Sequence, residues 1–224
     1  QFAERCRDLT AGVLGNDGWL RLGGRVADRL RRFREDPLAH ALPTPSGRIE
    51  IFSEKIAGHG DADCPGHPVW RAPDEWLGAA SRFPLHMLSD QPSTRLHSQL
   101  DHAPHSRAAK VAGRQPITIH PHDAAARGIA DGDVVRVFND RGACLAGAVV
   151  SDVVRPGVVR LSTGSWFDPA SWDVIGSLEK NGNPNVLTRD IGASRLSQGC
   201  TAQTCLVDLE KWHGAAPEVT AYDL

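Results

Sequence analysis

The feature that most constrains the fold is a series of short apolar segments between residues 81 and 212, separated by turn-forming residues. Glycine, proline and asparagine recur between these segments, and they permit the tight turns that join neighbouring strands. Many short strands with frequent turns are typical of a closed β-barrel, which leaves no strand edge unpaired. The pattern therefore predicts a mainly β domain with only short helices.

Local composition predicts the individual elements of this domain. We expect a short helix beginning at Pro121, since proline suits a first helical turn and Gly128 can end the helix. The sequence NDRG at residues 139–142 predicts a tight hairpin, because Asn and Gly tolerate positive φ. The expected strands are residues 83–88, 117–119, 134–138, 143–150, 158–161 and 204–210.

Residues 1–80 differ in character from the barrel sequence. Apolar residues at helical spacing and many arginines predict a surface helix over residues 20–34. Residues 41–80 are rich in proline and glycine, which disfavour regular structure, and only residues 48–53 alternate as a strand does. We interpret residues 1–80 as a helix and extended arm left from a preceding domain.

This interpretation divides the chain into three parts. The arm carries Phe52, Trp70 and Trp76, large apolar side chains that need a surface to cover them. Residues 81–212 are expected to form the barrel, and residues 213–224 a C-terminal tail.

The composition excludes several classes of function. Lys and Arg number 25 against 27 Asp and Glu. The formal net charge of −2 provides no excess positive charge to attract nucleic acid or an anionic membrane. No run approaches the roughly 20 apolar residues of a membrane span. We therefore expect neither nucleic-acid binding nor membrane insertion. The five cysteines are odd in number and widely spaced, which argues against a disulfide framework and a zinc or iron–sulfur site.

Three polar segments interrupt the expected strands, and we call them the first, second and third polar loops. The first, residues 88–100 (LSDQPSTRLHSQL), gathers many hydrogen-bonding side chains after a strand. For the second, residues 162–172 (STGSWFDPASW), we favour a turn with core aromatics over an aromatic pocket wall. The third, residues 181–203, is long and lacks a regular pattern, which is typical of a functional loop.

Other mechanisms have weaker support in the sequence. It contains no glycine-rich phosphate-binding motif, no nucleophile elbow and no marked carboxylate pair. Six of the ten histidines fall between His86 and His122, so a histidine-based metal-binding protein is one alternative. A non-catalytic β-barrel interaction module is the other.

Long strings in and between these loops resemble the dimethyl sulfoxide reductase family of molybdenum oxidoreductases. The strings are DQPSTRLHSQL, HPHDAAARGIADGDVVRVFNDRGACLAGAV and GNPNVLTRDIGASRLSQGCTAQTCLVDLE. The arm sequences DPLAHALPTPSGRIEIFSEKIA and DCPGHPVW resemble the segment that precedes the C-terminal domain in this family. The resemblance covers roughly residues 33–212 and is greatest to the biotin sulfoxide and trimethylamine N-oxide reductase branch.

The resemblance implies a six-stranded double-psi β-barrel that closes over a bis(molybdopterin guanine dinucleotide) molybdenum cofactor and hydrogen-bonds its pterins. It implies a small S- or N-oxide substrate of the biotin sulfoxide, dimethyl sulfoxide or trimethylamine N-oxide type. In the family the molybdenum's protein ligand lies upstream of this domain, so no residue here is matched to the metal or to catalysis. We therefore expect an inactive isolated chain whose partner is the remainder of a parent reductase, in the bacterial cytoplasm or periplasm.

Carried over by position, the resemblance also implies which residues contact the cofactor. Amide side chains offer the paired donors and acceptors that match a pterin edge, and a guanidinium fork suits anionic or carbonyl edges. The expected cofactor-binding residues are Ser89, Gln91, Arg95, His97, Ser98, Gln99, Asn185, Ala202 and Gln203.

Overall fold

The computed structural model describes residues 30–201 and 203–223. Its contacts divide the chain after Ser53. The described part of the first unit contains one helix, α2 (Arg31–Glu35). The expected helix over 20–34 is thus present at its C-terminal end, and residues 20–29 lie outside the described residues.

The expected strand over residues 48–53 is wrong. The structure has bends and irregular backbone there. The alternating Ile49 and Ile51 are 65% and 81% exposed. Alternation produces a strand only where a neighbouring strand pairs with its backbone, and the surrounding proline- and glycine-rich segment offers no such partner.

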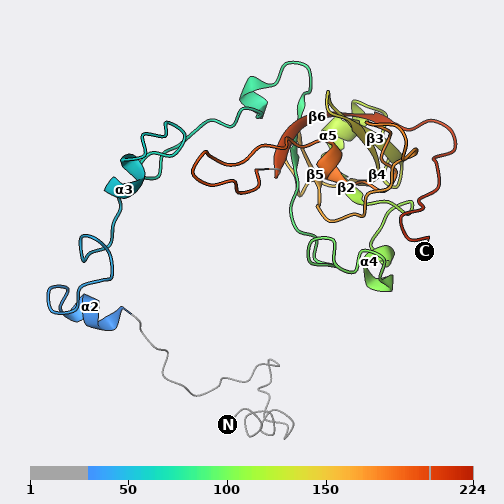
Figure 1. Ribbon diagram of the computed structural model, residues 1–224. Helices are drawn as coiled ribbons and strands as arrows, with labels where there is room; N and C mark the ends of the chain where they lie inside the picture. The colour runs from blue at the N-terminus through green and yellow to red at the C-terminus, as the bar shows by residue number, and fades with distance from the viewer. Residues whose placement is uncertain (1–29, 202, 224) are drawn as a thin grey trace, which may run out of the picture. The chain divides into compact units, whose positions relative to one another are not determined.

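Six strands of the second unit close into a barrel in the order β1-β5-β2-β4-β3-β6 (Figure 1). The pairs β1–β5 and β2–β4 are parallel, and the remaining neighbours, including β1–β6, are antiparallel. The prediction of a mainly β, double-psi barrel is confirmed. The strands are β1 (Leu85–Leu88), β2 (Pro116–Ile119), β3 (Val134–Phe138), β4 (Ala143–Val150), β5 (Val158–Leu161) and β6 (Thr204–Lys211).

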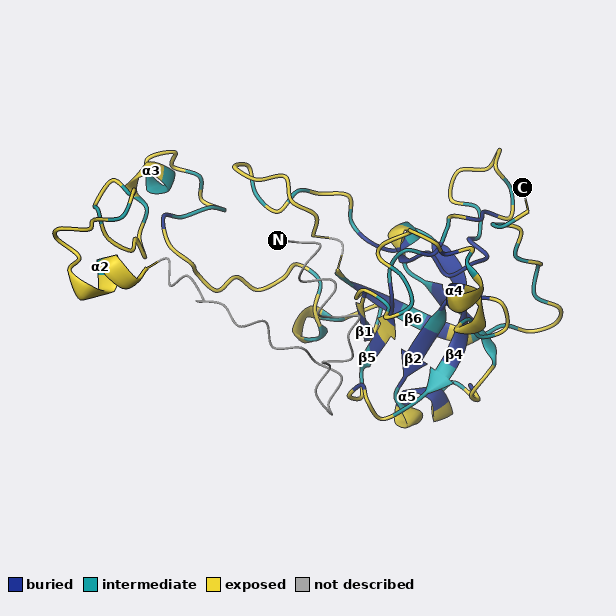
Figure 2. Cartoon of the chain, turned by 90° about the horizontal axis from the view of Figure 1, so that it is seen from below, coloured by how far each residue is buried: buried dark blue, intermediate teal, exposed yellow. Residues whose placement is uncertain are grey.

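Aliphatic side chains fill the barrel, and Figure 2 shows the strands largely in the colour of buried residues. On β3, the fully buried Val135 and Val137 alternate with half-buried neighbours. On β4, residues 143–148 are all buried, because the segment around Glu179 pairs with this strand. The amide N of Leu145 donates to the Glu179 carbonyl oxygen at 2.8 Å, so the start of the third polar loop is anchored on the barrel.

The helices of the second unit are all short. The expected helix after residue 120 is α5 (Pro121–Ala125), and Gly128 follows it with a φ of 61°. Elements of about one turn are missed by periodicity, because they are too short to repeat an apolar face. These are α3 (Glu54–Ala57), η1 (Leu77–Ala79), α4 (Pro104–Ala108) and η2 (Pro184–Val186). None of the helices within residues 30–201 and 203–223 has the length and hydropathy of a membrane span.

Gly147 in β4 allows the chain before β2 to lie directly on the strand. A Cβ at this position would stand 2.3 Å from the Val111 carbonyl oxygen and 2.5 Å from its Cβ. Because backbone cannot withdraw as a flexible side chain does, we expect Gly147→Ala to lower the free energy of unfolding by about 2 kcal/mol in urea denaturation. A Cβ at Gly199 meets nothing closer than 3.8 Å, so Gly199→Ala is the control. Equal losses in the two variants would contradict the steric argument.

Candidate functional site

The first polar loop leaves the barrel at the end of β1 and is tied to both other polar loops. The amide N of Ser89 donates to the Gln203 carbonyl oxygen at 2.8 Å, at the end of the third loop. The Ser162 hydroxyl donates to the Asp90 carboxylate at 2.6 Å, and the Thr163 amide donates to the Asp90 carbonyl oxygen at 2.9 Å. Strand ends therefore bring the three segments together, although they lie far apart in the sequence.

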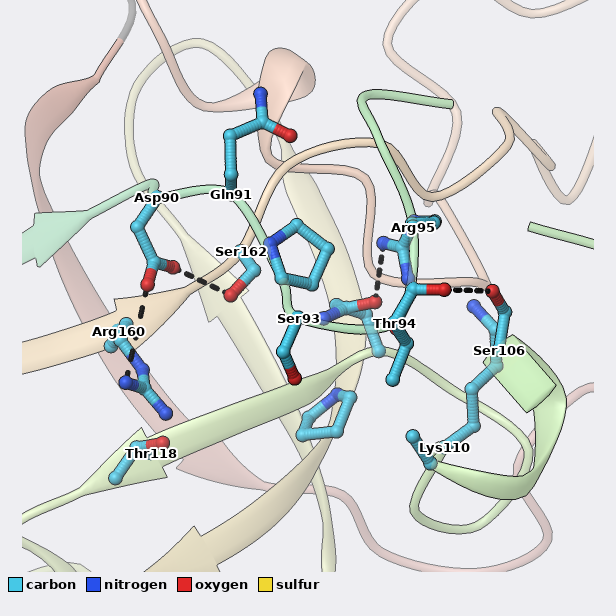
Figure 3. A pocket seen from close by; sticks show the side chains of 14 residues that line it. Asp90, Gln91, Ser93, Thr94, Arg95, Ser106, Lys110, Thr118, Arg160 and Ser162 are labelled. Carbon is cyan, nitrogen blue, oxygen red and sulfur yellow. Dashed lines mark hydrogen bonds and ion pairs between the residues drawn. The ribbon is translucent and has the colours of Figure 1, made fainter. Parts of the chain in front are cut away.

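A polar cavity of about 290 Å³ lies between the first polar loop, α4 and the neighbouring barrel strands (Figure 3). Hydroxyl, amide, carboxylate, guanidinium and ammonium groups line it. On one side Asp90 reaches Ser162 and lies 3.9 Å from the Arg160 guanidinium. On the α4 side the Ser106 hydroxyl donates to the Thr94 carbonyl oxygen at 3.2 Å. Of the residues expected to bind cofactor, Gln91 and Arg95 line this cavity.

Arg95 is anchored inside the protein. Its side chain is 2% exposed, and Nη2 donates to Gln115 Oε1 at 2.7 Å and to the Thr163 carbonyl oxygen at 2.9 Å. Its Nη1 lies 3.4 Å from the buried Asp101 carboxylate, which Lys110 Nζ also approaches, at 3.2 Å. The guanidinium thus holds the first polar loop against the second loop and the start of β2.

Asp101, Arg95 and Lys110 form a buried ion cluster in which Asp101 is the anion. Burial raises its pKa, but four neighbouring groups lower it by more: the Lys110 ammonium, the Trp166 N–H, the Tyr222 hydroxyl and the Arg95 guanidinium. The pKa therefore lies below its ordinary value. The carboxylate is therefore ionised at neutral pH and compensates the two buried cations. Removing it would leave both cations without a counter-ion.

The tip of the first polar loop is exposed but held in one conformation. His97 and Leu100 have positive φ angles of 51° and 62°, which are costly for residues with a Cβ. The Gln91 side chain supports the first of these, since its Oε1 accepts from the His97 amide at 3.0 Å and its Nε2 lies 2.9 Å from His97 Nδ1. Gly164 provides the space, because a Cβ there would stand 1.8 Å from the His97 carbonyl oxygen.

Two side chains of this tip are exposed and available to a ligand. No hydrogen bond from the described residues reaches the Ser98 hydroxyl or the side-chain amide of Gln99, although the Ser98 carbonyl oxygen accepts from the Trp166 indole at 2.8 Å. A hydroxyl and an amide offer both donors and acceptors. Backbone strain held by surrounding structure is characteristic of ligand-binding segments. The donor set therefore fits a polar heterocycle better than a single ion.

The second polar loop contradicts the favoured interpretation of core aromatics. Phe167 and Trp172 are 47% and 75% exposed and pack edge to face, with ring centroids 5.6 Å apart. With Val174 and Ile175 they line a second cavity of about 360 Å³. The alternative, an aromatic pocket wall, describes them correctly. Sequence alone could not decide between a core and a pocket wall, because aromatic residues suit both.

A buried carboxylate organises the start of the third polar loop. Glu179 is fully buried, and its Oε1 accepts from the amides of Asp168 and Asn181 at 3.2 and 3.0 Å. Its Oε2 accepts from the amides of Gly182 and Asn183, both at 2.7 Å. Burial raises the pKa of Glu179 more than these N–H donors lower it. The turn that opens the loop thus depends on one side chain.

The remaining expected cofactor residues are dispersed. Asn185 is exposed in η2, where its amide donates to Asn183 Oδ1 at 3.0 Å. Gln203 is exposed before β6, and Ala202 lies outside the described residues. Ser89 and Gln203 are brought together, but no hydrogen bond among the described residues joins Asn185 to the first polar loop. The described cavities are not lined by His97, Ser98, Gln99, Asn185 or Gln203.

Sequence reasoning missed several residues that build the site. Asp101 directly follows the first polar loop, and Tyr222 is the chain's only tyrosine, but no spacing rule joins them. The histidines, which suggested a metal-binding protein as an alternative, do not gather at one described site. Within the described ranges, no group of three or more His, Cys, Asp or Glu side chains could hold a metal ion.

The fold and the site define a closed β-barrel domain whose strand ends carry interlinked polar loops. The family of this domain follows from comparison with known proteins. Residues 85–206 match the model of the molydopterin dinucleotide binding domain. The chain belongs to this family, and the cofactor class implied by the three sequence strings is confirmed.

Curated relatives of the chain are S- and N-oxide reductases by name. It is 52% identical over 196 residues to the dimethyl sulfoxide/trimethylamine N-oxide reductase of Cereibacter sphaeroides, covering 87% of this chain and 24% of that protein. It is 53% identical over 195 residues to the biotin sulfoxide reductase of the same organism, covering 87% and 26%. The chain thus spans about a quarter of the length of the curated relatives it matches.

A solved structure supports the fold. Acetylene hydratase from Pelobacter acetylenicus superposes with a TM-score of 0.63 at 18% identity, over 79% of this chain and 25% of that protein. At this identity the similarity concerns the architecture alone.

Proposed function

We propose that the chain is the C-terminal cofactor-binding domain of a molybdenum-dependent S- or N-oxide reductase and that it hydrogen-bonds the pterins of a bis(molybdopterin guanine dinucleotide) cofactor. The observation that carries this proposal is the first polar loop, whose strained tip presents the Ser98 hydroxyl and the Gln99 amide to solvent. Family membership and relatives named as S- and N-oxide reductases support it. When bound, the cofactor supplies two-electron oxygen-atom chemistry, while the domain binds and orients it.

The contacts would be shared between the first and third polar loops. Ser98, Gln99 and His97 would meet the pterin edges directly, with Gln91 fixing the His97 ring. Arg95 would act from beneath, by holding the loop against the barrel. The other proposed contacts are Ser89, Asn185, Ala202 and Gln203.

The parent enzyme would supply what this chain lacks. We propose that residues 1–80 are the arm of a preceding domain, 81–212 the barrel and 213–224 a tail, with the metal ligand in the remainder of the parent reductase. That remainder would also cover exposed apolar side chains such as Trp70, Trp172 and Ile175, which are 85%, 75% and 104% exposed. The substrate would be a small S- or N-oxide.

The double variant Ser98→Ala/Gln99→Ala in the parent reductase tests the proposal. Neither side chain has an intramolecular hydrogen bond from the described residues, so the fold should be preserved. Losing about two hydrogen bonds to the pterin should weaken cofactor retention about tenfold. The measurement is molybdenum and acid-released guanine nucleotide per protein after gel filtration.

The matched control is Asp152→Asn, an exposed residue in the turn between β4 and β5. It should retain the cofactor content of the unmodified enzyme. If the double variant also keeps full molybdenum and nucleotide content through repeated filtration, the first polar loop does not bind the cofactor.

A further inference from the structure

Residues 216–222, which we call the strap, contain no helix or strand but are fixed to the barrel domain. The Thr220 amide and hydroxyl donate to the buried Asp168 carboxylate at 2.7 and 2.8 Å, and Lys180 Nζ donates to the Thr220 hydroxyl at 2.8 Å. The Arg114 guanidinium donates to the Pro217 carbonyl oxygen. Figure 1 shows this end of the chain near α4, and the Arg107 guanidinium of that helix lies 5.2 Å from the centroid of the Tyr222 ring. The strap therefore has a fixed position on the barrel domain.

Tyr222 carries the strap's contact to the buried ion cluster. Its hydroxyl donates to Asp101 Oδ2 at 2.8 Å, and Asn181 Nδ2 donates to the same hydroxyl at 3.2 Å. Two cations also face the ring, with the Arg107 guanidinium 5.2 Å and the Lys110 ammonium 5.6 Å from its centroid. Asp101 in turn pairs with Arg95, which anchors the first polar loop. This is one route from the strap to the loop.

Trp166 provides a second route to the loop. Its ring lies 5.8 Å from the Tyr222 ring and 5.1 Å from the His102 ring, measured between centroids. Its indole N–H donates to the Ser98 carbonyl oxygen at 2.8 Å, and its amide donates to Asp101 Oδ2 at 3.0 Å. One aromatic side chain thus links Tyr222 to the backbone of the exposed tip.

We propose that the strap positions the first polar loop for its ligand and that Tyr222 is the positioning residue, acting through Asp101 and Trp166. This inference rests on the proposed function, because it assigns a ligand to that loop. Among the described residues, no hydrogen bond or ring contact joins Tyr222 directly to residues 88–100, so its effect on the loop passes through these intermediates. The arrangement makes a distant, irregular segment part of the binding site's support.

Hydrogen exchange of the full chain tests the first half of the inference. Tyr222→Phe removes only the hydroxyl and keeps the ring against Trp166. Amides whose hydrogen bonds fix the tip region, those of His97, Gln99 and Trp166, should exchange about tenfold faster, because a hydrogen bond to a charged group is lost. Amides of the central strand β3 should not change.

The control is Glu218→Gln, an exposed strap residue that should leave all these rates unaltered. Unchanged exchange at the loop in Tyr222→Phe would overturn the inference. So would an equal acceleration in β3, because that would indicate a loss of global stability only.

Cofactor content of the parent reductase tests the second half. Tyr222→Phe should lower molybdenum and guanine nucleotide per protein several-fold. Full content in Tyr222→Phe, with loss in Ser98→Ala/Gln99→Ala, would overturn the positioning role and leave the proposed function intact. Full content in both variants would count against the proposed function, and hydrogen exchange would then decide alone whether the strap holds the loop.

Discussion

Asp101→Asn is expected to lower the free energy of unfolding of the chain by about 4 kcal/mol. The carboxylate is fully buried between Arg95 and Lys110, whose side chains are 2% and 3% exposed. An amide of the same shape keeps the packing but leaves two buried cations without an anion, which is the costly way to break a buried ion pair. Urea denaturation at pH 7, followed by circular dichroism, measures the loss.

Two further measurements separate charge from packing at Asp101. The double variant Asp101→Asn/Lys110→Met should recover part of the loss, because one uncompensated cation is removed with its anion. The control Asp152→Asn, in an exposed turn, should stay within about 0.5 kcal/mol of the unmodified chain. A loss below about 1 kcal/mol in Asp101→Asn would contradict the ionic role.

The pH dependence of stability has a definite sign at Asp101. Its pKa is lower in the folded chain than the ordinary value of 3.8. The folded state therefore binds this proton less readily, and the stabilisation is present above about pH 4 and is lost as pH falls through the lowered pKa. Asp101→Asn should lack this acid-dependent component.

Glu179→Gln is expected to lower the free energy of unfolding by about 3 kcal/mol. The carboxylate oxygens accept hydrogen bonds from four backbone amides. Glutamine replaces one oxygen with an NH₂ group, so two buried amide donors lose their acceptor and face another donor. The same denaturation experiment measures the effect, and hydrogen exchange at Gly182 and Asn183 localises it.

The control for this substitution is Glu218→Gln, the same chemical change at an exposed position. Equal stability of the two variants would show that the third polar loop does not depend on the carboxylate. Because burial raises the pKa of Glu179, the folded state binds its proton more readily than the unfolded state. Its stabilising contribution should therefore decline as pH rises above the ordinary 4.5 towards the raised pKa, and the variant should lack this decline.

Most of the barrel could be predicted from the sequence because its signals are local. The strands over 134–138, 143–150 and 158–161 have the expected bounds, and the hairpin NDRG joins β3 to β4. Alternating burial and turn residues depend on near neighbours alone. The same reasoning was wrong for residues 48–53, where a strand-like pattern has no partner strand.

The candidate site could be predicted only in part. The three polar loops were identified because long polar segments between strands are unusual. The burial of Arg95 could not be predicted, since its partners Asp101, Gln115 and Thr163 come from separate segments. The exposure of Phe167 and Trp172 likewise could not be predicted from the type of these residues.

The barrel class, the three polar loops and, through the long matching strings, the family all follow from the sequence. Tertiary structure alone decided which polar side chains are free and which are consumed by the protein. Ser98 and Gln99 face solvent, while Arg95 and Asp101 are buried. The physical reason is that a buried charge needs its partner within a few ångströms, and Tyr222 reaches Asp101 only because the fold returns the end of the chain to the first polar loop.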